Sequence, residues 1–179
     1  MVTIIKRQGI VKAKSNAAQD LRGLFEVGLK DLYSVEKTLS KSLPKMVGNA
    51  SSSKLVRNLN QLTEKEEHVY SLEQVFKSAG IKPNAKKCDA MVGILKENEG
   101  IMRKKMVVLG DAGIIFAGQK VKHYGIATYG TLHAYAKMLG EDKVANLLAM
   151  TLEKEKRTDA GLTEIALFDM NQKATTAKV

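Results

Sequence analysis

The 179-residue sequence predicts an all-α protein, on the grounds of its composition and the spacing of its apolar residues. It contains two prolines, Pro44 and Pro83, no tryptophan and only 5% aromatic residues. A β-sheet favours β-branched and aromatic residues, whereas leucine, alanine, lysine and glutamate are abundant here. Apolar residues recur at intervals of three and four over four long segments, which is the period of an amphipathic helix. A chain of this length buries enough surface for one core, so we expect one helical domain.

The first two long helices have recognisable ends in the sequence. The first is predicted from Asn16 to about Val47. Pro44 lies inside it and cannot donate a backbone hydrogen bond, so we expect a kink in the last turns. The second helix is predicted to follow the N-cap serines Ser51 to Ser53 and to end at Gly80.

A connecting helix and two further long helices complete the predicted fold. Residues 88–106 predict a shorter connecting helix. Asp111 is predicted to cap a third long helix that ends at Gly140, and residues 141–170 predict the fourth. Short first and last connections with one long middle connection give two antiparallel hairpins joined by a crossover. This is the ferritin-like variant of the four-helix bundle.

The charge distribution separates the ends of the chain from the helical domain. We divide the chain into a basic N-terminal arm (1–16), a helical bundle domain (17–170) and a flexible C-terminal tail (171–179). The formal net charge is +10, of which residues 1–14 contribute +4 and residues 169–179 contribute +1, leaving +5 for residues 15–168. The arm favours weak association with nucleic acid or another polyanion, and the alternative is a solvated tail. Its basic residues are Lys6, Arg7, Lys12 and Lys14.

Cysteine usage and hydropathy bear on the compartment. The single cysteine, Cys88, excludes an intrachain disulfide and favours a reducing, cytoplasmic location. Apolar runs in the first fourteen residues are only two or three residues long, too short for a signal peptide or a membrane span. We therefore expect a soluble protein without a membrane partner.

Carboxylates at the middle of the predicted helices suggest a metal site. The helix midpoints fall near residues 34, 66, 125 and 155, at one level of the bundle. Glu155 projects to the centre of its apolar stripe, and Glu36 and Glu66 flank theirs, while Asp159 lies one turn after Glu155. Converging carboxylates repel one another unless a cation or a basic side chain compensates, and a pair of iron or manganese ions is a common solution in such bundles.

Each of these residues also has a structural interpretation. Glu155 could form a buried salt bridge with Lys65 or Lys122 in place of a metal bond. Glu36 and Glu66 could pair with lysines at the surface of the bundle. His68 and His123 project away from their apolar stripes, so we expect them at the surface or at an interface.

Several segments together resemble one bacterial family. They are LRGLFEVGLKDLYSVEKTLSKSLPKM, SLEQVF, KKCDAMVGIL, QKVKHYGIATYGTL and TLEKEKRTDAGLTEIA, in this order between residues 20 and 168. They are similar to the YciF-like family (YciE/YciF) of ferritin-like stress proteins. The resemblance implies a helical, usually homodimeric protein related in fold to rubrerythrin, associated with stress responses and with a ferroxidase label.

The resemblance also transfers individual positions. Glu36 and Glu155 match acidic positions of the family, and Asp31, His123 and Asp159 match its wider pattern. In the second helix Glu64, Glu66 and His68 remain, while Thr63 stands where a glutamate is common. In the third helix Lys122 and Gly125 stand where the family motif, which resembles QKVEHYEIA, offers two carboxylates. The metal ligands implied are Glu36, Glu66, Glu155 and Asp159, with Glu64, His68 and His123 as weaker candidates.

Two functions therefore follow from the sequence. The first is a ferroxidase-type bundle with iron or manganese and an incomplete two-metal site, for which no catalytic residue is assigned. The alternative is a non-catalytic dimeric scaffold or binding protein without a cofactor, in which Lys122 and Lys65 replace the metal charge and the basic arm associates with nucleic acid.

Overall fold

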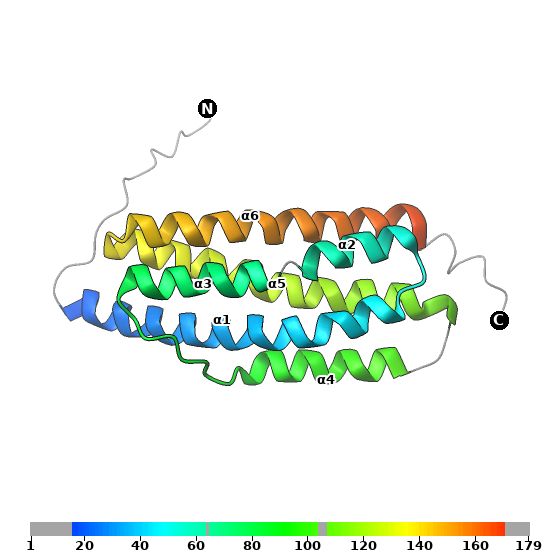
Figure 1. The fold of residues 1–179 in the computed structure, drawn as a ribbon, viewed down its shortest axis with the longest axis horizontal. Coiled ribbons are helices and arrows are strands. Elements are labelled where there is room, and N and C mark those ends of the chain that lie inside the picture. Colours follow the sequence, from blue (N-terminus) through cyan, green and yellow to red (C-terminus); the bar gives the residue numbers. More distant parts are fainter. Residues whose placement is uncertain (1–15, 64, 104–106, 171–179) are drawn as a thin grey trace, which may run out of the picture.

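The structure of this chain is a computed structural model that describes residues 16–63, 65–103 and 107–170. All regular elements in these ranges are helices, which confirms the predicted all-α class (Figure 1). They are α1 (Asn16–Asn49), α2 (Ser53–Thr63), α3 (Lys65–Ala79), α4 (Asp89–Arg103), α5 (Val107–Leu139) and α6 (Asp142–Ile165), followed by one turn of π-helix, η1 (Ala166–Met170). None of the helices in the described ranges is long and apolar enough to cross a membrane.

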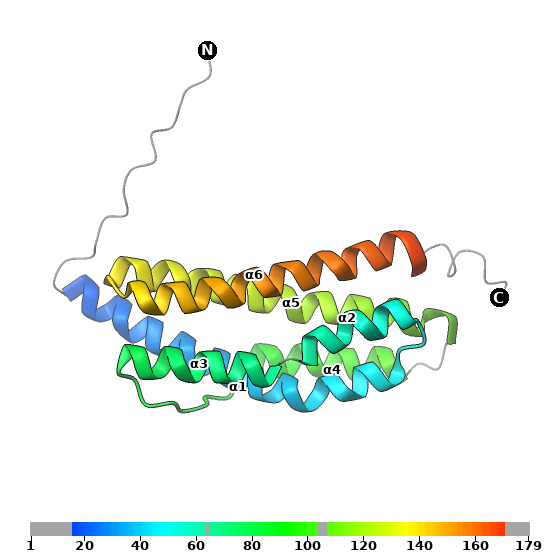
Figure 2. The ribbon, with the colours of Figure 1, turned by 45° about the horizontal axis from the view of Figure 1, so that its top comes forward.

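The long helices α1, α5 and α6 run side by side as rods, α2 and α3 lie along the same direction, and α4 lies beside them (Figures 1 and 2). Both α2 and α3 pack against α1 and α6, and α4 packs against α5. Helix α1 continues through Pro44 to Asn49, and both views show its C-terminal end turning away from the direction of its first half.

The predicted second long helix corresponds to α2, which is described as far as Thr63, and α3, which is described from Lys65, with residue 64 outside the described residues. The ribbons of α2 and α3 are offset from each other (Figure 2). The predicted stop at Gly80 is confirmed, and this glycine has a φ of 67°, a left-handed conformation that glycine adopts without steric cost.

The predicted capping role of Asp111 is also wrong. Asp111 lies inside α5, and its buried carboxylate binds the turn between α1 and α2. The backbone N–H of Ser51 donates to Oδ1 at 2.7 Å, and Ser51 Oγ and the N–H of Ser52 donate to Oδ2 at 2.7 and 2.8 Å. Asp111 thus satisfies amides near the start of α2 from a neighbouring helix, because those amides have no partner within α2 itself.

Two apolar clusters fill the interior, one toward each end of the bundle. One includes Phe25, Leu29, Leu72, Phe76 and Leu148, and the other includes Leu39, Leu43, Leu59, Ile114 and Leu162. Along α5 and α6, a buried charged residue lies in the sequence between the buried residues of one apolar cluster and those of the other, and α1 and α3 also bury a charged or polar residue. The bundle therefore has a polar layer at the level predicted from the helix midpoints.

Candidate functional site

Four ionisable side chains from four helices meet in the polar layer. They are Glu36 of α1, His68 of α3, Lys122 of α5 and Glu155 of α6, with relative exposures of 1%, 8%, 1% and 2%. Tyr129 of α5, at 1%, completes the layer. Burying a charged group is costly unless it is paired and hydrogen-bonded, so the contacts among these side chains decide what the layer can do.

Lys122 and Glu155 form a short charged contact in the layer. Lys122 Nζ donates to Glu155 Oε1 at 2.7 Å, and both side chains are almost completely buried. A charge-assisted hydrogen bond of this length offsets part of the desolvation of both groups. The sequence left two interpretations of Glu155, a metal ligand or a partner in a buried salt bridge with Lys65 or Lys122. The observed contact is the salt bridge with Lys122.

His68 lies between the two carboxylates. Its Nδ1 is 3.3 Å from Glu155 Oε1 and 3.8 Å from Glu36 Oε1, yet no side chain hydrogen-bonds to this nitrogen in the described part of the chain. The expectation that His68 would lie at the surface or at an interface is wrong, because His68 is 8% exposed and lies one turn before the buried Leu72 on the same face of α3. In the sequence, the only indication that His68 belongs to the site was the family resemblance, which implied it as one of the weaker candidate ligands.

Tyr129 donates from its hydroxyl to Glu36 Oε1 at 3.2 Å, and its ring meets that of His68 edge to face at a centroid distance of 6.5 Å. Burial raises the pKa of Tyr129 well above its usual 10, and the negative charges of Glu36 and Glu155 and the hydrogen bond raise it further. The hydroxyl is therefore a protonated donor at ordinary pH. Tyr129 was not assigned to the site from sequence, although it follows Gly125 by four residues and thus shares its helix face.

Gly125 does not leave a vacant space in the polar layer. A Cβ at this position would lie 2.7 Å from Glu155 Oε2 and 3.4 Å from its Cδ. The carboxylate of Glu155 therefore occupies the place where a side chain at position 125 would start. A ligand at 125 requires Glu155 to move first.

The layer contains a possible set of ligands for one metal ion. Glu36, His68 and Glu155 can each offer one ligand atom, and these atoms lie within 4.8 Å of one another. Carboxylate and imidazole ligands suit manganese, iron or zinc. The described residues do not fit a two-metal centre, because an ammonium lies on Glu155 Oε1 and glycine stands at position 125.

The structure leaves the other predicted ligands outside this group. Asp159 pairs with His123, whose Nε2 is 3.1 Å from Asp159 Oδ2, and the His123 side chain is 67% exposed. The surface position expected for His123 is thus correct, and neither residue joins the three buried ligands. Glu64 and the side chains of Lys65 and Glu66 lie outside the described residues.

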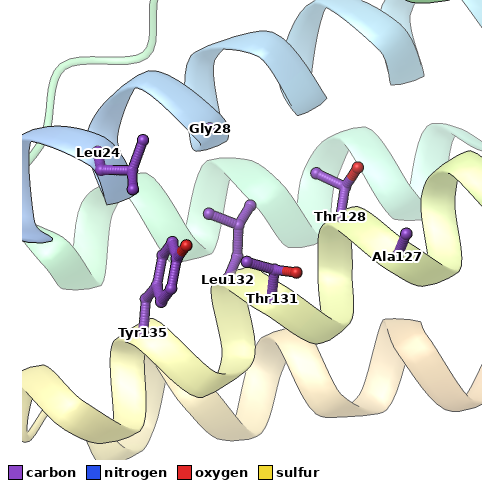
Figure 3. Close-up of a pocket in the computed structure, with 7 residues that line it drawn as sticks. All are labelled: Leu24, Gly28, Ala127, Thr128, Thr131, Leu132 and Tyr135. Atoms are coloured by element: carbon purple, nitrogen blue, oxygen red, sulfur yellow. The ribbon is translucent and has the colours of Figure 1, made fainter.

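A pocket lies away from the polar layer, between α1 and α5 (Figure 3). It has a volume of about 280 Å³, and its lining includes Leu24, Gly28, Leu132 and Tyr135. Leu132 fills the space beside Gly28, where an added Cβ would lie 2.8 Å from it. The lining is mostly apolar, its side-chain polar groups are the hydroxyls of Thr128, Thr131 and Tyr135, and it holds no carboxylate, imidazole, thiol or amine.

Comparisons with known proteins agree with the resemblance seen in the sequence. A family model described as a domain of unknown function, DUF892, matches residues 20–175. Protein YciF of Escherichia coli (strain K12) is 42% identical over 149 residues, which cover 82% of this chain and 90% of that protein. The predicted membership of the YciF-like family is confirmed.

Solved structures give the same result. The crystal structure of the E. coli stress protein YciF aligns with a TM-score of 0.80 at 37% identity, over 85% of this chain and 98% of that one. YcfI of Rhodopseudomonas palustris, to which a structural role has been ascribed, aligns with a TM-score of 0.78 at 35% identity, over 84% and 98% of the two chains. A protein of Xanthomonas campestris pv. campestris, at 18% identity and a TM-score of 0.66 over 87% and 97%, shares the fold alone.

Proposed function

Because the chain belongs to the DUF892 family, which includes YciF-like stress proteins, we propose that it is a stress-associated structural protein with a ferritin-like bundle. In this proposal Lys122, and not a pair of metal ions, balances the central carboxylates. The observation that carries it is the 2.7 Å contact between Lys122 Nζ and Glu155 Oε1, with both side chains 1 to 2% exposed. A structural role has also been ascribed to the relative from R. palustris.

The chemistry of the ion pair supports this proposal. A two-metal centre needs several carboxylates free to bridge the ions. Here Glu155 Oε1 accepts a hydrogen bond from Lys122, and Glu36 Oε1 accepts one from Tyr129. An ammonium group competes with a cation for the same oxygen, and it supplies positive charge without redox chemistry. The layer then serves to hold four helices in register and not to oxidise iron.

A second candidate function rests on His68. Its Nδ1 is buried and accepts or donates no hydrogen bond among the described residues, and it faces the oxygens of Glu36 and Glu155. Such an arrangement favours one divalent ion bound by these three side chains, with Lys122 displaced from Glu155. The two candidates differ in metal content, so one measurement separates them.

The test is elemental analysis of protein purified without a metal-affinity tag, combined with Fe(II) oxidation in air. We expect far less than one metal ion per chain, no oxidation above the rate in buffer, and the same midpoint of thermal unfolding with and without a chelator. Two ions per chain, or catalysed oxidation, would contradict the structural proposal. One ion per chain that disappears in His68→Ala would support the second candidate.

A variant pair sharpens this test. Lys122→Met removes the competing ammonium, and we expect it to gain binding of one Mn(II) per chain relative to the native protein. Lys120→Met is the matched control, because Lys120 is on the same helix but pairs with Glu97 near the surface.

The expected homodimer and cytoplasmic location belong to the same proposal. Sedimentation equilibrium should give the mass of two chains.

A further inference from the structure

The net positive charge of the helical domain is concentrated in one hairpin. Residues 15–168 carry a net charge of +5. Residues 37–63 contain five basic residues and no acidic residue, so this segment alone contributes +5 and the remainder of residues 15–168 has no net charge. The segment spans the second half of α1, the turn and all of α2. The five are Lys37, Lys41, Lys45, Lys54 and Arg57, and all are exposed.

Three of these lysines form a stripe along α1. Lys37, Lys41 and Lys45 follow one another at intervals of four, which places them on one side of the helix about 6 Å apart along its axis. Arg57 lies four residues after the start of α2 at Ser53, and Lys45 lies four residues before the end of α1 at Asn49. None of these three lysines nor Arg57 forms an ion pair with a carboxylate in the described part of the chain.

A groove runs beside this stripe, between α1 and α3. It has a volume of about 230 Å³ and is lined by Lys37, Ser40, Lys41, Val69, Tyr70 and Glu73. The Tyr70 side chain is 62% exposed, and Lys37 Nζ lies 5.0 Å from the centroid of the Tyr33 ring. Glu73 is the acidic residue of this lining, and its Oε1 accepts a hydrogen bond from Tyr33 at 2.8 Å. The groove thus combines a row of amines with an accessible aromatic ring.

We propose that this hairpin and groove bind single-stranded nucleic acid. Proteins that bind single strands without sequence preference combine a positive groove along the phosphates with aromatic side chains on which bases stack. The lysine stripe matches the first requirement and Tyr70 the second. The surface is separate from the buried layer and from the N-terminal arm, so the inference depends on neither the proposed function nor Lys6, Arg7, Lys12 and Lys14.

The test is fluorescence anisotropy of the full chain with a labelled oligothymidylate over a series of salt concentrations. In the triple variant Lys37→Gln, Lys41→Gln, Lys45→Gln, loss of three phosphate contacts should reduce the slope of log K against log salt by about 2. Tyr70→Ala should weaken binding by roughly 5- to 150-fold, the loss expected for one stacked base. Circular dichroism of each variant should match the native spectrum.

The control removes the same charge elsewhere. Lys77, Lys96 and Lys143 are exposed on α3, α4 and α6, and their triple glutamine variant should bind almost as tightly as the native chain. Equal loss in both triple variants would show that only net charge matters and would overturn the proposal. The proposal would also be overturned if deletion of residues 1–14 abolished binding while the triple variant of Lys37, Lys41 and Lys45 bound as tightly as the native chain. The preference for single strands would be refuted if a DNA duplex competed as well as the oligothymidylate and Tyr70→Ala left the affinity unchanged.

Discussion

Replacing Lys122 with methionine tests the central claim about the polar layer. Methionine keeps most of the length of the lysine side chain and removes its charge. Glu155 then keeps a buried carboxylate whose nearest remaining basic group is His68, 3.3 Å away. We expect the variant to be strongly destabilised in metal-free buffer.

The expected magnitude follows from burial. Lys122 and Glu155 side chains are 1% and 2% exposed, so solvent screens their contact very little. Breaking a buried pair by removing one partner costs about 3–5 kcal/mol, because the other charge stays buried without compensation. Domains of this kind are stable by about 5–15 kcal/mol, so the loss is a large fraction of the total.

The assay is urea unfolding followed by circular dichroism, in a double-mutant cycle with Glu155→Leu. The double variant removes both charges, and we expect its free energy of unfolding to equal or exceed that of the native protein, by up to about 1–4 kcal/mol. The control Lys120→Met breaks an ion pair near the surface and should cost at most about 1 kcal/mol. If Lys122→Met costs no more than this control, or the double variant is as unstable as the sum of the singles, the ion pair does not organise the layer.

Three further variants test other contacts of the structure. Gly125→Ala places a Cβ against Glu155 Oε2 and should destabilise the fold by about 1–3 kcal/mol in urea unfolding. Tyr129→Phe removes the hydrogen bond to Glu36 and should cost about 1.5–3 kcal/mol at neutral pH. Because the folded protein raises the pKa of Tyr129, this stabilisation is complete below the unfolded pKa of about 10 and is lost as the pH rises above it, so the two proteins should converge in alkaline unfolding experiments. Asp111→Ala removes three hydrogen bonds at the start of α2 and should cost about 2 kcal/mol, with faster amide exchange in that turn.

Matched controls separate these contacts from general effects. Gly93 lies on the exposed side of α4 with no atom near its missing Cβ, so Gly93→Ala should stabilise the protein by about 0.4–1 kcal/mol. Tyr70→Phe alters an exposed tyrosine and should leave stability unchanged at neutral pH. Asp89→Ala alters an exposed aspartate at the start of α4 and should have a small effect. Equal effects in a variant and its control would show that the contact contributes nothing specific.

The sequence predicted the helices and the level of the site because both depend on local patterns. A three-to-four spacing of apolar residues depends on neighbours along one helix, and glycine stops such as Gly80 act within one turn. The burial of Glu155 followed from its place at the centre of an apolar stripe. These statements need no knowledge of which helix lies opposite.

Predictions that needed a neighbouring helix were less successful. Asp111 has the residue type of an N-cap, but its partners are two serines about sixty positions earlier in the chain. His68 was assigned to the surface or an interface because it lies off the apolar stripe counted along its helix, yet its side chain is buried near Glu36 of α1 and Glu155 of α6. Side-chain contacts between helices depend on rotation and offset, which a helical period does not contain.

The sequence by itself determined that this chain is helical and that it resembles YciF-like proteins, and the resemblance implied two carboxylates at the positions of Lys122 and Gly125. Only the tertiary structure decided what these two positions mean. It brings Lys122 onto Glu155, thirty-three residues away, and places the Glu155 carboxylate over Gly125. The physical reason is that a buried charge is stable only beside its counter-charge, and which helices supply the two charges is fixed by how the rods pack.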